Sequence, residues 1–278
     1  MKIAAIQLNS KSNKQENLDK ARSFITKAAV DGAELVSLPE YFNFMGQDTK
    51  KRENAENIPN GETTELLSQL AKKYSIFIHA GSIVEKYNDE KSYNSSFVIN
   101  PEGNIIAKYH KIHLFDIGIE GMPTYKESDR IQGGNEPVMV DLPFGKAGLS
   151  ICYDLRFPEL FRSYALNGAK ILFIPAAFTR YTGMLHWEAL LRARAIENQC
   201  YVVAAAQFGS HLPGKECYGN SLIIDPWGTV IARASEGEGV IMAEIDDELV
   251  KGARESIPCL NHRKPEVYQN NSVVKSMY

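Results

Sequence analysis

Segments with the apolar alternation of β-strands recur along this chain of 278 residues, and amphipathic helical segments separate the first of them. Residues 2–8 alternate like a strand, and residues 13–30 follow with the apolar period of a helix. Residues 62–73 repeat the helical pattern, and residues 76–82 have the composition of another strand. The N-terminal part of the chain therefore predicts a βαβαβ order.

Later strands are predicted to be joined by tight turns as well as by helices. Turn sequences stand between extended segments at residues 100–103, 143–145 and 225–228, and each predicts a β-hairpin. After residue 150, helices are predicted at residues 158–167 and 186–197, and strands at residues 171–174 and 201–206. Crossovers mixed with hairpins predict an α/β fold in which two sheets pack together and helices cover their outer faces.

The composition favours one large globular domain. Apolar residues make up 44% of the chain, which suffices for a continuous core, and no internal linker is visible. We expect a single domain over residues 1–265 and a C-terminal tail over residues 266–278. The polar stretches at residues 44–60 and 115–137 predict long loops, and loops of this length in a compact domain tend to form sites.

Charge and targeting features narrow the class of partner. A net charge of −3 provides no basic surface for nucleic acid, and no polybasic run indicates a membrane surface. Residues 1–8 lack the features of a signal peptide, and the apolar segment at 171–178 is too short to span a membrane. We therefore expect a cytoplasmic protein whose partners are small molecules or other proteins.

The four cysteines show neither CxxC spacing nor the density of a disulfide scaffold. This spacing favours a reducing compartment and argues against a metal site. Cys200 lies in a strand-like segment and is predicted to be a core residue, whereas Cys217 and Cys259 are placed in polar loops without a paired base. Trp187 has the helical spacing of a packing residue.

Cys152 lies where an apolar strand stops and a helix beginning with proline follows, in GLSICYDLRFPELF. A strand-to-helix bend leaves the first amides of the turn unpaired, so the Tyr153 amide could stabilise an oxyanion above the thiol. The alternative is that Cys152 is a small buried hydrophobe, which is the commoner role of a cysteine. The charged residues of DLRFPELFR favour a functional thiol.

Glu40 follows another short strand, in ELVSLPEYF. A glutamate at such a position is most often a solvated surface residue. The neighbouring aromatic residues Tyr41, Phe42 and Phe44 weaken that alternative, because they would partly desolvate the carboxylate and raise its pKa toward that of a useful base.

Lys111 follows the predicted strand IIAKYH and lies among apolar and aromatic residues in KYHKIHLFD. An unpaired ammonium would be costly there, so a carboxylate should face it, and Glu40 and Glu127 are the candidates. A thiol needs a base or a nearby cation to become nucleophilic. Glutamate and lysine can supply these, whereas His113 and His186 do not lie in cysteine-protease signatures.

With PEYF, YHKIHLFD and SICYDLRFPELFR in this order, the chain resembles the nitrilase superfamily of carbon–nitrogen hydrolases. The resemblance continues through HWEALLRARAIENQCYVVAAAQ and DPWG, over nearly the whole chain, and is greatest to the Nit-type amidases, the branch of deaminated-glutathione amidase and omega-amidase. It implies a four-layer α-β-β-α sandwich, assembled as a homodimer or a higher homo-oligomer, often through the helix after the nucleophile and the C-terminal region. It also implies that Cys152 is the nucleophile, Glu40 the base, Lys111 the charged partner and Glu127 a second glutamate.

The expected activity is hydrolysis of a small linear amide through a thioester, without a metal or organic cofactor. Alternatives are a nitrilase or an N-carbamoyl-amine amidohydrolase with the same residues, and a non-catalytic binding protein of the same fold. Residues in segments flanking the reactive group are candidates for contact with substrate: Tyr41, Phe42, Tyr125, Arg156, Phe178, Thr179 and His186. Arg156 could equally be tied to Asp154 or Glu159, and His186 could simply open the helix that follows.

Overall fold

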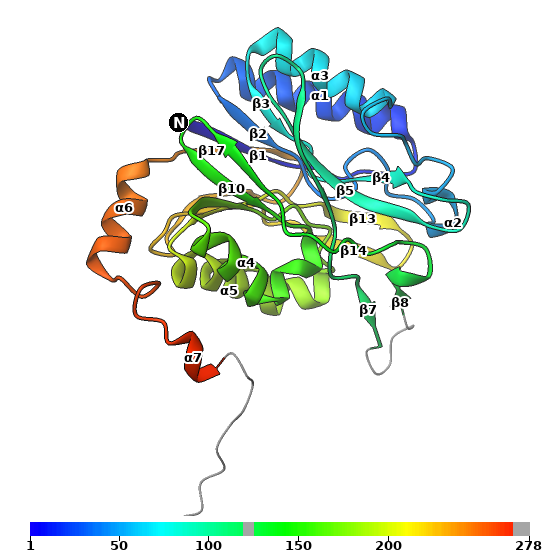
Figure 1. Cartoon of the computed structure of the whole chain (residues 1–278). Coiled ribbons are helices and arrows are strands. Elements are labelled where there is room, and N and C mark those ends of the chain that lie inside the picture. The colour runs from blue at the N-terminus through cyan, green and yellow to red at the C-terminus, as the bar shows by residue number, and fades with distance from the viewer. Residues whose placement is uncertain (119–124, 269–278) are drawn as a thin grey trace, which may run out of the picture.

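The computed structural model describes residues 1–118 and 125–268 of the chain. Two β-sheets lie face to face, α1 and α3 cover the outer face of the first sheet, and α4 and α5 cover the outer face of the second (Figure 1). The predicted four-layer α-β-β-α sandwich in a single domain is confirmed.

The first sheet has the order β17-β1-β2-β3-β5-β4, with β6 paired to β5. Its strands are β1 (Lys2–Gln7), β2 (Leu35–Ser37), β3 (Phe77–His79), β4 (Ile83–Lys86), β5 (Ser92–Ile99), β6 (Ile105–His110) and β17 (Gly239–Glu244). The second sheet has the order β16-β15-β12-β11-β10-β9. Its strands are β9 (Met139–Leu142), β10 (Gly145–Leu149), β11 (Ala169–Phe173), β12 (Tyr201–Ala204), β15 (Leu222–Ile224) and β16 (Val230–Arg233).

Helices and short hairpins complete the domain. The helices are α1 (Lys14–Val30), α2 (Asp48–Lys51), α3 (Glu62–Tyr74), α4 (Pro158–Leu166), α5 (Arg180–Asn198), α6 (Asp247–Ser256) and α7 (Pro265–Tyr268). Two short 3₁₀ turns are η1 (Glu127–Asp129) and η2 (Cys152–Arg156). Separate two-stranded ribbons are formed by β7 (Asp116–Ile117) with β8 (Tyr125–Lys126), and by β13 (Phe208–Leu212) with β14 (Lys215–Tyr218).

The side-chain alternation of β1 explains how its sheet separates two cores. Ala4 and Ile6 pack with the apolar residues of α1 and α3. Ile3 and Ala5 point to the opposite face and belong to a core that includes the second sheet, α4 and α5. Both faces of the strand are therefore buried, so the alternation predicted for residues 2–8 does not separate a buried face from an exposed one.

The structure confirms most predicted elements. Strands β1, β2 and β3 run parallel, as the βαβαβ pattern predicts. The pairs β5–β6, β9–β10 and β15–β16 are antiparallel hairpins at the predicted turns.

The predicted start of α5 at residue 186 is wrong. This helix begins at Arg180, with Thr179 as its N-cap residue, so His186 lies inside the helix and does not open it. Strand β17 and helix α6 were not predicted, and β17 pairs with β1.

The C-terminal end falls partly within the described chain. The short helix α7 crosses the predicted boundary at residue 265, and residues 269–278 of the predicted tail lie outside the described residues.

Among the helices in the described part of the chain, none combines the length and apolar character needed to cross a membrane.

Candidate active site

Three strands end at one place in the molecule. Pairing through β3 and β5 makes β6 run in the same direction as β2, so the segments after both strands leave the first sheet at the same edge. Strand β10 of the second sheet leads to η2. The residues that follow these strands, Glu40, Lys111 and Cys152, line one cavity together with Glu127.

Lys111 lies between two buried carboxylates. Its Nζ is 3.0 Å from Oε1 of Glu40 and 2.9 Å from Oε2 of Glu127. The side chains of Lys111, Glu40 and Glu127 are only 2%, 3% and 4% exposed. The predicted partners of the lysine are therefore both present, and one ammonium is shared by two carboxylates in a desolvated site.

Glu40 is held by donors on both of its oxygens. Its Oε1 accepts hydrogen bonds from Lys111 and from Nδ2 of Asn94 at 2.9 Å, and its Oε2 accepts one from the backbone amide of Ala177 at 2.8 Å. Asn94 comes from β5 and Ala177 from the segment after β11, so both sheets position this carboxylate. Sequence reasoning did not identify Asn94 or Ala177.

Glu127 opens the turn η1 and is fixed by four neighbours, one of which is Asn94, whose Nδ2 donates to Oε1 at 3.5 Å. Its Oε1 accepts a hydrogen bond from the Tyr41 hydroxyl at 3.0 Å, and its Oε2 accepts one from the Phe115 amide at 2.8 Å, in addition to the contacts with Lys111. Tyr41 has a φ of +53°, an uncommon backbone conformation outside glycine. It turns the tyrosine toward Glu127 directly after Glu40.

Cys152 stands at the predicted strand-to-helix bend. Its φ is +48°, its amide donates to the carbonyl of Pro175 at 2.9 Å, and its side chain is buried. A left-handed residue at such a bend is the kind of backbone strain that is stored at functional sites. Tyr153, the next residue, also lines the cavity, and its amide is among the first of the turn, where helical amides lack intrahelical partners.

The electrostatics of the site couple these groups. Burial raises the pKa of the Cys152 thiol well above its ordinary value, and the negative charge of Glu40 adds to this effect. Burial by itself would lower the pKa of Lys111, but Glu127 and Glu40 outweigh it and raise that pKa well above its usual range. Burial opposes ionisation of Glu127 as well, yet Lys111 and the Phe115 amide keep the Glu127 pKa below its ordinary value.

The cavity above these residues has a volume of about 580 Å³. Four predicted substrate-contact residues line it: Tyr41, Tyr125, Phe178 and Thr179. Both long loops predicted to form a site contribute to its walls. A volume of this size is typical of sites for small molecules.

Three other predicted contact residues do not line the cavity. Phe42 is fully buried in the core beneath α1 and α3, because the left-handed turn at Tyr41 sends successive side chains to different sides. The guanidinium carbon of Arg156 lies 5.1 Å from the Phe178 ring centroid and 5.9 Å from that of Tyr153, and Arg156 forms an ion pair with neither Asp154 nor Glu159. His186 lies 3.4 Å from the guanidinium nitrogens of Arg156.

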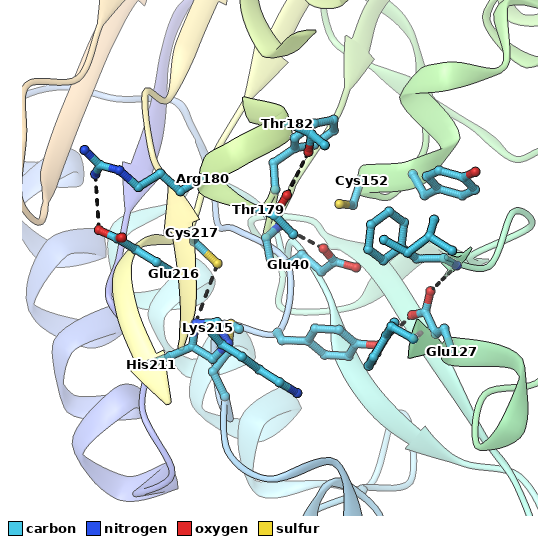
Figure 2. A pocket seen from close by; sticks show the side chains of 18 of the residues that line it. Glu40, Glu127, Cys152, Thr179, Arg180, Thr182, His211, Lys215, Glu216 and Cys217 are labelled. Carbon is cyan, nitrogen blue, oxygen red and sulfur yellow. Dashed lines mark hydrogen bonds and ion pairs between the residues drawn. The ribbon is translucent and has the colours of Figure 1, made fainter. Parts of the chain in front are cut away.

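Cys217 was predicted to lie in a polar loop without a paired base, and this prediction is wrong. Cys217 lies in strand β14, is buried, and lines the cavity, with its Sγ 3.8 Å from Nδ1 of His211 (Figure 2). Cys200 is a core residue and Trp187 is a packing residue, as predicted. Burial raises the pKa of Cys217 to about 12, and the negative charge of Glu40 adds to this effect, so the resting thiol is protonated at neutral pH.

Two further features of the site bear on cofactors and charge. Across residues 1–118 and 125–268, no group of histidine, cysteine and carboxylate side chains is arranged to hold a metal ion. Asp48 and Lys51 from α2 and Lys215 from β14 also line the cavity, and sequence reasoning did not identify them.

Comparison with known proteins agrees with this geometry. The carbon-nitrogen hydrolase family matches residues 2–255. A deaminated glutathione amidase of Synechocystis is 46% identical over 94% of this chain and 97% of its own length, and human omega-amidase NIT2 is 41% identical over 96% of each. The crystal structure of Saccharomyces cerevisiae Nit3, from branch 10 of the nitrilase superfamily, superposes with a TM-score of 0.84 at 36% identity, covering 93% of this chain and 94% of that one. The chain belongs to the carbon-nitrogen hydrolase family, in the Nit branch of the nitrilase superfamily.

Proposed function

We propose that this protein hydrolyses a small linear amide to ammonia and a carboxylic acid, with Cys152 as nucleophile, Glu40 as base and Lys111 as the cation at the oxyanion. The observation that carries the proposal is one desolvated cavity that contains the thiol and a lysine shared by two carboxylates. Membership of a family whose relatives are named as amidases supports the same reaction class.

In the first half of the reaction the Cys152 sulfur attacks the amide carbon. Glu40 takes the thiol proton as the carbon–sulfur bond forms, which is needed because the resting thiol is protonated. Lys111 and the Tyr153 amide stabilise the negative charge on the carbonyl oxygen. Glu40 then gives its proton to the nitrogen, the carbon–nitrogen bond breaks, and ammonia leaves a thioester on Cys152.

In the second half a water molecule takes the place of the ammonia. Glu40 removes one proton from this water, whose oxygen attacks the thioester carbon. The carbon–sulfur bond breaks, the proton returns to the sulfur, and the carboxylic acid leaves. The role proposed for Glu127 is to hold the Lys111 ammonium in place throughout, through contacts of 2.9 and 3.2 Å.

The substrate is proposed to resemble those of the relatives, as an omega-amide or deaminated glutathione. Tyr125, Phe178 and Thr179 line the cavity and are the proposed contacts for the substrate chain. A nitrilase or an N-carbamoyl-amine amidohydrolase would use the same residues. Release of ammonia should therefore be compared for omega-dicarboxylic monoamides, deaminated glutathione, N-carbamoyl-amines and simple nitriles.

The test of the chemistry is the Cys152→Ala variant, with Cys259→Ala as the matched control. Cys259 is a half-buried thiol outside the cavity, so its removal should leave amide turnover unchanged. The proposal requires that Cys152→Ala retain its fold and lose turnover. Turnover in this variant equal to that of the control would refute the scheme.

We propose further that the protein is a cytoplasmic homodimer built on α5. Tyr181, Leu185 and Ile196 are 54%, 61% and 49% exposed, and their spacing places them along one face of this helix. An exposed apolar helix face is typical of an interface. Light scattering should give twice the chain mass for the wild type and the monomer mass for Leu185→Glu, and a monomeric wild type would contradict the proposal.

The free state of all four cysteines supports the proposed cytoplasmic location, because the cytoplasm is a reducing compartment.

A further inference from the structure

Asn94 contacts both buried carboxylates of the site without lining the cavity itself. The residue belongs to β5 and is fully buried. Its Nδ2 donates to Oε1 of Glu40 at 2.9 Å and lies 3.5 Å from Oε1 of Glu127. Because an amide nitrogen carries two hydrogens, one asparagine can serve both carboxylates.

Lys111 binds the same two oxygens. Its Nζ lies 3.0 Å from Oε1 of Glu40 and 3.2 Å from Oε1 of Glu127. The backbone amide of Lys111 also donates to the carbonyl of Asn94 at 2.9 Å, which continues the pairing of β5 with β6. The backbone therefore holds the two side-chain donors at a fixed spacing.

Donors fill most of the acceptor positions of Glu40. A carboxylate offers about two lone-pair directions on each oxygen. Lys111 and Asn94 take both directions on Oε1, and the Ala177 amide takes one on Oε2 at 2.8 Å. Among the donors of residues 1–118 and 125–268, none takes the second direction on Oε2. This oxygen is therefore the one that can accept a further proton.

The Cys152 thiol lies on the Oε2 side of Glu40. Burial raises the pKa of the thiol, hydrogen bonding to Glu40 adds to this effect, and the Ala177 amide opposes it. The amide that donates to Oε2 thus also acts on the sulfur. Figure 2 shows the Glu40 carboxylate next to Cys152. The open position on Oε2 is consequently within reach of the thiol proton.

The other half of the Asn94 amide gives no benefit to the fold. Among the described residues, no hydrogen-bond partner reaches its buried Oδ1. Turning the amide over would place this oxygen against the two carboxylates, so their charges fix its orientation. A buried polar atom without a partner is unfavourable for folding, which argues that Asn94 serves the site and not the stability of β5.

We propose that Asn94 is a positioning residue that reserves Oε2 of Glu40 for the proton of Cys152. The inference rests on the proposed amide hydrolysis. With Oε1 bound by Asn94 and Lys111, the proton passes from Sγ to Oε2, so the sulfur–hydrogen bond breaks as the oxygen–hydrogen bond forms. The Asn94 donor also favours the ionised form of Glu40, which promotes transfer of this proton onward to the leaving nitrogen.

Asn94 is neutral, so its substitution removes a donor without changing the charge of the site. The titratable and charged groups that act on or respond to Glu40 all remain in place: Tyr41, Lys111, Glu127, Cys152 and Cys217. A change in the pH dependence of such a variant therefore reports the lost hydrogen bond.

The first experiment measures kcat and KM against pH for Asn94→Leu, a substitution of similar size without a donor, with glutaramate as substrate. We expect kcat to fall roughly tenfold to a hundredfold and the acid limb of its pH profile to rise by about one unit, because a carboxylate that has lost a donor protonates more readily. KM should stay within about twofold, because Asn94 does not line the cavity. Asn94→Ala removes the donor without adding bulk, and should give the same shift if Asn94→Leu does not fold.

Asn198→Leu is the matched control. Asn198 is equally buried at the end of α5, does not line the cavity, and its Oδ1 likewise lacks a partner among the described residues. This variant should keep the kcat and pH profile of the wild type. An acid limb for the Asn94 variants that superposes on that of the control, or a loss confined to KM, would overturn the positioning role.

The second experiment measures activation of the thiol without amide hydrolysis. The rate of alkylation of Cys152 by iodoacetamide is followed against pH by mass spectrometry of its peptide. The acid limb should rise by the same amount in Asn94→Leu and should not move in Asn198→Leu, and equal profiles would overturn the inference. If the alkylation depends on Asn94 in this way but no amide is hydrolysed, the proposed function fails and the role of Asn94 stands.

Discussion

The backbone amide of Ile151 donates a hydrogen bond of 2.8 Å to the carboxylate of Asp154. The same buried carboxylate accepts the Tyr109 hydroxyl at 2.8 Å and the His113 amide at 3.0 Å. Tyr109 and His113 flank Lys111, whereas Ile151 precedes Cys152. Asp154 therefore joins the two segments that carry the lysine and the thiol, and it sets their relative position.

Asp154→Asn is expected to impair both stability and turnover. An amide in place of the carboxylate presents N–H donors to groups that are themselves donors, which should lower the free energy of unfolding by about 1–3 kcal/mol. Displacement of Cys152 relative to Lys111 should lower kcat by roughly a hundredfold. Denaturant unfolding and steady-state kinetics measure the two effects, with Asp141→Asn, an exposed residue of β9, as the control. A folded Asp154→Asn variant with the wild-type kcat would show that this link does not position the site.

Glu127 is expected to make the protein sensitive to acid. The pKa of Glu127 is lowered in the folded protein, so its stabilisation is complete above the ordinary value of 4.5 and is lost as the pH falls through the folded pKa. Glu127→Gln should therefore lower the free energy of unfolding by about 3 kcal/mol at neutral pH, and this difference from the wild type should shrink below about pH 4.5. Thermal melts across this range measure it, with the exposed Glu159→Gln as the control. A difference that does not depend on pH would contradict the ion-pair account.

The Cys152 thiol is expected to be protonated in the resting protein. Its pKa is raised by burial and by Glu40, although Lys111 acts in the opposite direction. The difference in ultraviolet thiolate absorbance between the wild type and Cys152→Ala should therefore be absent from about pH 6 to pH 9. A thiolate signal at neutral pH would mean that the sulfur is ionised before substrate arrives, and Glu40 would not be needed as the base for attack.

The parts of the fold that local patterns determine could be predicted from the sequence. The face of α1 that carries Leu18 and Ile25 has a helical period, and the turn at residues 225–228 has proline and glycine in hairpin positions. The start of α5 could not be predicted, because Gly183 looks like a helix breaker. In the structure Gly183 lies against Tyr218 of β14, where a Cβ would come within 2.4 Å of the tyrosine, so the glycine serves close packing.

The active site likewise combines residues that local sequence patterns predict with residues that only long-range contacts bring into place. Glu40, Lys111 and Cys152 each follow a recognisable strand, so strand direction brings them together. Cys217 and Lys215 could not be placed, because the β13–β14 hairpin has no clear apolar alternation and reaches the cavity through a long-range pairing of Cys217 with Thr179. Phe42 was misplaced because no local pattern reveals the left-handed turn at Tyr41.

The central claim is that the acyl group of the substrate becomes attached to Cys152. Wild-type protein should be mixed with a slowly hydrolysed amide, quenched in acid, digested, and analysed by mass spectrometry. We predict an added mass equal to the acyl group on the peptide that contains Cys152, and its absence in Cys152→Ala. No acyl adduct during active turnover, or an adduct on the Cys217 peptide in its place, would contradict the account.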